Sequence, residues 1–78
     1  MEIKVLGSGC AKCNQLEEAT KLAAAKAGID AHIEHITDMA QIMGFGVMTT
    51  PALVVDGEVR VAGRVPSVED LVALLTRD

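Results

Sequence analysis

The chain has 78 residues, of which 50% are hydrophobic and 23% are charged, and its formal net charge is −4. This balance excludes an intrinsically disordered chain, which combines low hydrophobicity with high net charge, and the length predicts a single domain over residues 1–78. A nucleic-acid-binding surface is also excluded, because acidic residues outnumber basic ones and Phe45 is the single aromatic residue.

The first part of the chain predicts a strand, a helix and a second strand. Residues 3–6 form the first strand, because apolar side chains there precede the turn-forming run Gly7-Ser8-Gly9. From Cys10 onward, small and apolar residues recur at helical spacing in a segment rich in Ala, Leu, Glu and Lys. Gly28 is typical of a helix end, and the alternation over residues 29–36 predicts the second strand.

The middle of the chain predicts a short helix followed by an extended segment. The helix covers residues 39–43, and either Thr37 or Asp38 serves as its N-cap. The residues that lead into Pro51 are expected to be extended, because proline restricts the residue before it.

The last part predicts a β-hairpin and a final helix. Residues 52–55 are a continuous apolar run, as in a strand buried on both faces, and Asp56-Gly57 is a hairpin turn that leads into a returning strand at 58–62. Ser67 with Asp70 resembles a capping box for the helix that follows. The order β-α-β-α-β-β-α predicts an α/β sandwich with a mixed four-stranded sheet.

The cellular location is expected to be the cytoplasm. No apolar run is long enough to span a bilayer, and the opening residues 1–4 lack the pattern of a signal peptide. Two cysteines are too few for a secreted scaffold held together by disulfides. In this setting a cysteine pair is typical of redox chemistry or of metal binding.

The two cysteines form the motif Cys10-Ala11-Lys12-Cys13, which lies where the first strand turns into the first helix. The backbone N–H groups and the dipole at a helix N-terminus stabilise a thiolate, and Lys12 adds a positive charge. We therefore predict that Cys10 is the exposed nucleophile and that Cys13, one turn further, is the more buried resolving thiol. Ala11 and Lys12, between the cysteines, are expected to modulate the reduction potential.

Metal binding is the main alternative for this motif. A closed zinc site needs four ligands, and His32 and His35 are predicted to point to opposite faces of their strand, so no zinc site is expected. Two-coordinate binding of a soft metal such as Cu(I) by Cys10 and Cys13 stays open, as do two inert core cysteines. The histidines are predicted to be partly exposed and without function. Three methionines are further candidate ligands for copper, but they are predicted to fill gaps in the core instead: Met39, Met43 and Met48.

Three features together resemble the thioredoxin superfamily: the C-x-x-C motif after the first strand, Thr50-Pro51 before a buried strand, and Gly63 after the hairpin. The turn from Gly7 to Cys13 is especially similar to that of glutaredoxins. The whole chain resembles a family of small bacterial and archaeal thioredoxin-like proteins, some of which are called redox-active disulfide proteins. The resemblance implies a thioredoxin-like three-layer sandwich.

The resemblance also implies a site and partners. Pro51 is expected to be cis and to pack beside the cysteine pair, the backbone of Thr50 to pair with an extended substrate segment, and Gly63 to line the same groove. The implied partners are protein disulfides and a reductase such as a thioredoxin reductase, with no cofactor. The implied role is electron transport and cell redox homeostasis. From composition and hydropathy we expect neither nucleic acid nor membrane as a partner, and we expect the protein to be a monomer.

Several positions depart from the family patterns. Gly9 stands where ordinary thioredoxins have Trp, and Ala11-Lys12 replaces Gly-Pro, so their reduction potential does not carry over. Lys4 occupies the position at which thioredoxins keep a buried acid. Residues 62–67 differ from the stretch with which glutaredoxins hold glutathione, so a conventional glutathione site is not expected.

The sequence as a whole thus predicts a thiol–disulfide oxidoreductase. The rival from another class is a module that binds or delivers a soft metal of the Cu(I) type with the same cysteines. Copper chaperones end in a strand and usually carry Met two residues before the first cysteine, whereas this chain has Ser8 there and ends in a predicted helix. A third alternative is an interaction module that kept the fold without the activity.

Overall fold

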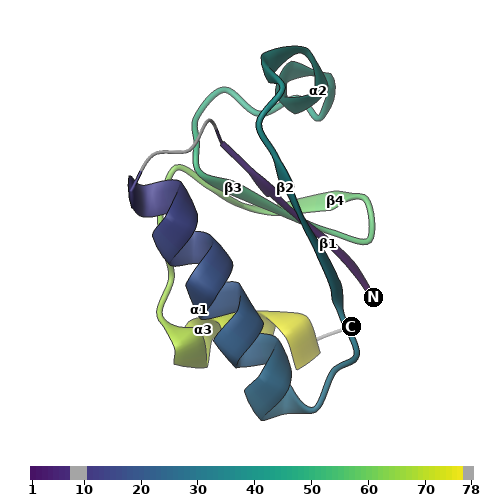
Figure 1. Ribbon diagram of the computed structural model, residues 1–78, viewed down its shortest axis with the longest axis vertical. Coiled ribbons are helices and arrows are strands. Elements are labelled where there is room, and N and C mark those ends of the chain that lie inside the picture. The colour runs from purple at the N-terminus through teal and green to yellow at the C-terminus, as the bar shows by residue number, and fades with distance from the viewer. Residues whose placement is uncertain (8–10, 77–78) are drawn as a thin grey trace.

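The computed structural model describes residues 1–7 and 11–76 of the chain (Figure 1). Within them the elements follow the predicted order β-α-β-α-β-β-α. Both strands of the hairpin begin and end at the residues that the sequence predicts. The elements are β1 (Glu2–Leu6), α1 (Ala11–Ala27), β2 (His32–Ile36), α2 (Met39–Gly44), β3 (Ala52–Val55), β4 (Glu58–Ala62) and α3 (Val68–Thr76).

The second strand is shorter than predicted because the end of α1 extends into its first residues. Gly28 has a φ of +68°, and its N–H donates to the Ala25 carbonyl at 3.2 Å. The N–H of Ile29 donates to the Ala24 carbonyl at 3.0 Å. These are the two bonds of a Schellman motif, which satisfies the last carbonyls of a helix, so Ile29 belongs to the helix cap and β2 begins only at His32.

The described strands form the mixed four-stranded sheet that the sequence predicts, and their order in it is β2-β1-β3-β4. β1 pairs with β2 in parallel and with β3 in antiparallel orientation, and β4 completes the hairpin on β3. The two central strands, β1 and β3, therefore run in opposite directions, and the end of β1 lies next to the beginning of β3 through the pair Leu6 and Ala52.

The sheet is covered on both faces, which gives three layers. On one face α1 and α3 pack over the larger core (Figure 1), which includes Ile3, Val5, Leu16, Leu53 and Leu71. On the other face α2 and the segment after it cover a smaller cluster of Leu6, Ile42, Ala52 and Val54. Successive residues of a strand point to opposite faces, so each central strand contributes to both cores.

The predicted caps are present at both shorter helices. The Asp38 carboxylate accepts from the N–H of Ala40 at 3.0 Å and caps α2, while the Ser67 hydroxyl accepts from the N–H of Asp70 at 3.1 Å and caps α3. These bonds satisfy N–H groups that have no partner inside the helix. No helix within residues 1–7 and 11–76 combines the length and the apolar character needed to cross a membrane.

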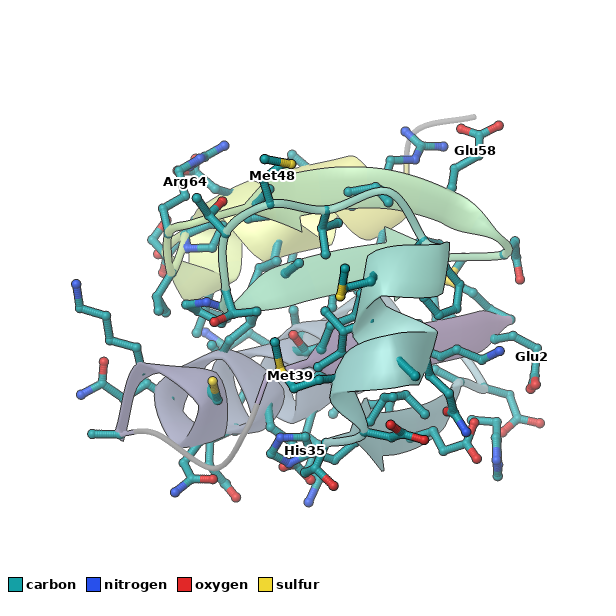
Figure 2. The ribbon with its side chains drawn as sticks, turned by 90° about the horizontal axis from the view of Figure 1, so that it is seen from above. Glu2, His35, Met39, Met48, Glu58 and Arg64 are labelled. Carbon is teal, nitrogen blue, oxygen red and sulfur yellow. The ribbon has the colours of Figure 1, made fainter. Side chains whose placement is uncertain are left out.

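The prediction that three methionines fill the core is wrong. Met39 is 56% exposed, Met43 is 69% exposed and Met48 is 96% exposed, and Figure 2 shows Met48 projecting beyond the ribbon. For Met39 and Met43 the reason is the size of α2, which has six residues and buries only Ile42, whereas Met48 lies in the segment after this helix. The space beneath it is filled by Phe45 and Val47 instead.

Candidate functional site

Cys13 lies in the first turn of α1 and is fully buried, with 0% of its surface exposed. Ala11 and Lys12, which precede it in the helix, are exposed to solvent. Cys10, the predicted nucleophile, lies outside the residues that the structure describes, as do Ser8 and Gly9.

Gly7, at the end of β1, is in close contact with Cys13. A Cβ atom added at Gly7 would overlap the Cys13 sulfur, and it would lie 3.2 Å from the Cys13 Cβ and 3.8 Å from the Cβ of Thr50. The absence of a side chain at this position therefore lets β1 approach the thiol. Gly7 is the point at which the end of β1, the first turn of α1 and the segment before β3 meet.

The segment before β3 is held by a contact with the loop that follows β4. The peptide bond between Thr50 and Pro51 is cis, with Thr50 exposed and Pro51 buried. The Pro51 carbonyl accepts a hydrogen bond from the N–H of Gly63 at 2.8 Å. Gly63 has a φ of +80°, and a Cβ atom added there would lie 2.9 Å from the Thr49 hydroxyl oxygen. The structure thus brings Thr50, Pro51 and Gly63 to the side of Gly7 and Cys13.

Replacing Gly63 with alanine is expected to destabilise the fold more than the same change at Gly57. Both glycines have positive φ, +80° and +87°, which costs an L-residue about 1–2 kcal/mol. Only at Gly63 must a neighbour, the Thr49 side chain, also move, because the space around Gly57 is open. Urea denaturation followed by circular dichroism measures both costs. Equal losses in the two variants would show that the contact between Gly63 and Thr49 has no energetic weight.

His35, for which the sequence predicts no function, lies against the same turn. His35 on β2 has its Nδ1 2.9 Å from the Glu17 carboxylate and its Nε2 3.1 Å from the Gly7 carbonyl oxygen. Glu17 also pairs with the Lys21 amine at 3.3 Å. The side chain of His35 is 20% exposed, which agrees with the predicted partial exposure, whereas His32 is exposed. Local sequence carries no sign of this contact, because Gly7, Glu17 and His35 lie in three separate segments of the chain.

Lys4, which occupies the position of the acid found in thioredoxins, lies on the face of β1 that points away from α1 and α3. Its amine lies 5.4 Å from the centre of the Phe45 ring, a distance suited to a cation–π interaction. Lys4 therefore belongs to the α2 side of the sheet. Within residues 1–7 and 11–76, no group of three His, Cys, Asp or Glu side chains could hold a metal ion.

Comparison with known proteins matches residues 1–76 to the family model described as thioredoxin domain. A protein named thioredoxin from Methanothermobacter thermautotrophicus is 42% identical over 76 residues, which cover 97% of this chain and 99% of that protein. Another protein named thioredoxin, from Methanocaldococcus jannaschii, is 41% identical over 69 residues, or 88% of this chain and 79% of that protein. The similarity therefore extends over the whole arrangement of strands and helices described above.

Proposed function

The chain belongs to the thioredoxin domain family, and from this membership we propose that it reduces protein disulfides with the Cys10–Cys13 pair. The observation that carries the proposal is the position of Cys13, buried in the first turn of α1 against Gly7 and near Thr50. A resolving thiol needs this protection, because it must react with its neighbour in the chain and not with solvent reagents. The cysteines exchange electrons without a cofactor.

The proposed reaction has two exchange steps. The Cys10 thiolate attacks one sulfur of the substrate disulfide, so that a mixed disulfide forms and the other substrate sulfur leaves as a thiolate that takes up a proton. The Cys13 thiolate then attacks the Cys10 sulfur and releases the second substrate sulfur, which is also protonated. Two electrons pass from the protein dithiol to the substrate, and the protein is left with a Cys10–Cys13 disulfide.

The surface beside Cys13 suits a substrate in extended conformation. Thr50 is exposed, and the segment that carries it is fixed between Gly7 and the Gly63 loop, so its backbone can pair with a partner chain. Ala11 and Lys12 are exposed next to the thiol and are suited to modulate its reactivity. We further propose that a reductase such as a thioredoxin reductase restores the dithiol, and that the protein works as a monomer in the cytoplasm.

Replacing Cys13 with serine is expected to trap the mixed disulfide. Without the resolving thiol the second step cannot occur, so Cys10 stays bonded to the substrate sulfur. The measurement is the mass of the protein after incubation of the reduced variant with a disulfide-containing peptide, before and after dithiothreitol. A peptide adduct on nearly every molecule that dithiothreitol removes is the expected result.

The matched control is the double variant in which Cys10 is also serine, which should form no adduct. If the single variant forms no adduct while the unaltered protein turns over, Cys13 is not the resolving thiol. If the unaltered protein forms no Cys10–Cys13 disulfide under oxidising conditions, the oxidoreductase proposal fails. Titration of the reduced protein with Cu(I) then tests the alternative, a module that binds or delivers a soft metal.

A further inference from the structure

Both hydrogen-bond partners of the His35 ring are acceptors. Its two nitrogens face the Glu17 carboxylate at 2.9 Å and the Gly7 carbonyl oxygen at 3.1 Å, and both of these groups are acceptors. A neutral imidazole has one N–H and can donate to only one of them, leaving a lone pair against the other oxygen. The imidazolium carries an N–H on each nitrogen and can donate to both.

The two acceptors belong to the segments that adjoin Cys13, namely Gly7 after β1 and Glu17 in α1. Gly7 contacts the Cys13 sulfur directly, and Glu17 follows Cys13 by four residues, which places it one turn further along the same face of α1. Figure 2 shows His35 beside α1, on the side of the molecule away from Met48 and Arg64. The ring of His35 therefore links the two elements that hold the thiol, the end of β1 and the first turns of α1.

We propose that His35 is a positioning residue for the cysteine pair, whose imidazolium binds the Gly7 carbonyl, fixes the approach of Gly7 to Cys13, and adds positive charge beside the first turns of α1. This proposal deepens the proposed oxidoreductase function and rests on it for its biological meaning. The imidazolium acts through Gly7 and not by contact with a substrate. Its charge favours a thiolate over a thiol, which increases the share of the reduced protein that is ready to attack a disulfide.

The charges around the ring support this direction of effect. Glu17 joins the imidazolium on one side and the Lys21 amine on the other, at 3.3 Å, so the carboxylate is flanked by two cations. Gly7, which directly follows β1, contributes a carbonyl oxygen to the ring. Loss of His35 would remove one of the two cations and leave the carboxylate with Lys21, whose side chain is 51% exposed. The environment of the thiols would become more negative, which disfavours a thiolate.

The test is the pH dependence of thiol alkylation. The reduced protein reacts with iodoacetamide over a range of about pH 5 to pH 9, where cysteine thiolates form, and mass spectrometry assigns the product to each cysteine. Replacing His35 with leucine is expected to raise the pH of half-reaction by about half a unit, a threefold loss of thiolate at a fixed pH. Replacing it with lysine, a cation that donates without accepting, should restore the original profile.

Replacing His32 with leucine is the matched control, because His32 is an exposed histidine on the same strand and should leave the profile unchanged. A His35→Leu profile that coincides with that of the unaltered protein overturns the proposal. A shift that lysine does not restore also overturns it, since the effect is then one of packing. If the leucine variant does not fold, His35→Gln, which is neutral, takes its place with the same expected shift.

Alkylation requires no disulfide exchange, so this experiment separates the two proposals. If the protein traps no mixed disulfide, but His35→Leu shifts the alkylation profile and lysine restores it, the oxidoreductase proposal is wrong and the positioning role of His35 stands. If the protein traps the mixed disulfide, but His35→Leu leaves the alkylation profile unchanged, the oxidoreductase proposal stands and the positioning role of His35 is wrong.

Discussion

Replacing Cys10 with serine is expected to reduce the rate of disulfide reduction to that of the uncatalysed reaction. A thiolate is the attacking group in thiol–disulfide exchange, and a serine hydroxyl is not ionised near neutral pH. Cys13 cannot take over the attack, because it is fully buried in the first turn of α1 against Gly7. The measurement is the reduction of a disulfide peptide, with dithiothreitol as the electron source, compared with dithiothreitol alone.

The control for Cys10→Ser is the variant Cys13→Ser, which keeps the nucleophile. When each variant is first reduced and then freed of dithiothreitol, the Cys13 variant should consume one equivalent of peptide disulfide and stop, whereas the Cys10 variant should consume none. Far-ultraviolet circular dichroism must show the same helix content in both. Turnover that persists without Cys10 would assign the attack to Cys13 and would require that the first turn of α1 opens during the reaction.

Replacing Gly7 with alanine is expected to cause the largest loss of stability among single-methyl changes at the described glycines. The new Cβ would overlap the Cys13 sulfur, which is fully buried and cannot swing into solvent. Overpacking of this kind costs about 1–3 kcal/mol. For a domain of this size, each kcal/mol lowers the melting temperature by about 4–8 °C. Circular dichroism is the suitable probe, because the chain has neither Trp nor Tyr.

Gly44→Ala is the matched control for this change. Gly44 is the last residue of α2, and a Cβ atom added there meets nothing within 4 Å. Alanine is favoured over glycine in a helix by up to about 1 kcal/mol, so this variant should be as stable as the unaltered protein or more stable. Equal melting temperatures for the Gly7 and Gly44 variants would contradict the close approach of β1 to Cys13.

Local signals were sufficient to predict most of the fold. The caps at Asp38 and Ser67 and the turn at Asp56-Gly57 each depend on residues within a few positions, and the structure contains all three. The errors arose where a local pattern competed with another. Ile29 fits the alternation of a strand, yet it serves the Schellman motif that ends α1. Met39 and Met43 are apolar, yet a helix as short as α2 can bury only one face.

The candidate site was only partly predictable. Burial of Cys13 follows from its place one turn into a helix that packs on a sheet. The bonds of His35 depend on quantities that a single sequence does not encode locally: the register of β2 on β1, and the rotation of α1 that turns Glu17 toward β2. Their partners lie 18 and 28 residues away in the chain. A lone histidine in a strand therefore gave no sign of these contacts.

The position of Thr50 at the entrance to β3 has a consequence for the entropy of binding. β3 is buried along its whole length and is paired on both sides, and the Gly63 contact holds the residue just before it. The backbone of this exposed segment therefore loses its conformational freedom when the protein folds. A substrate chain that pairs with Thr50 would have to order only its own residues, because the protein segment is already ordered. The entropic cost of association is therefore smaller, which suits a substrate that is bound briefly and then released.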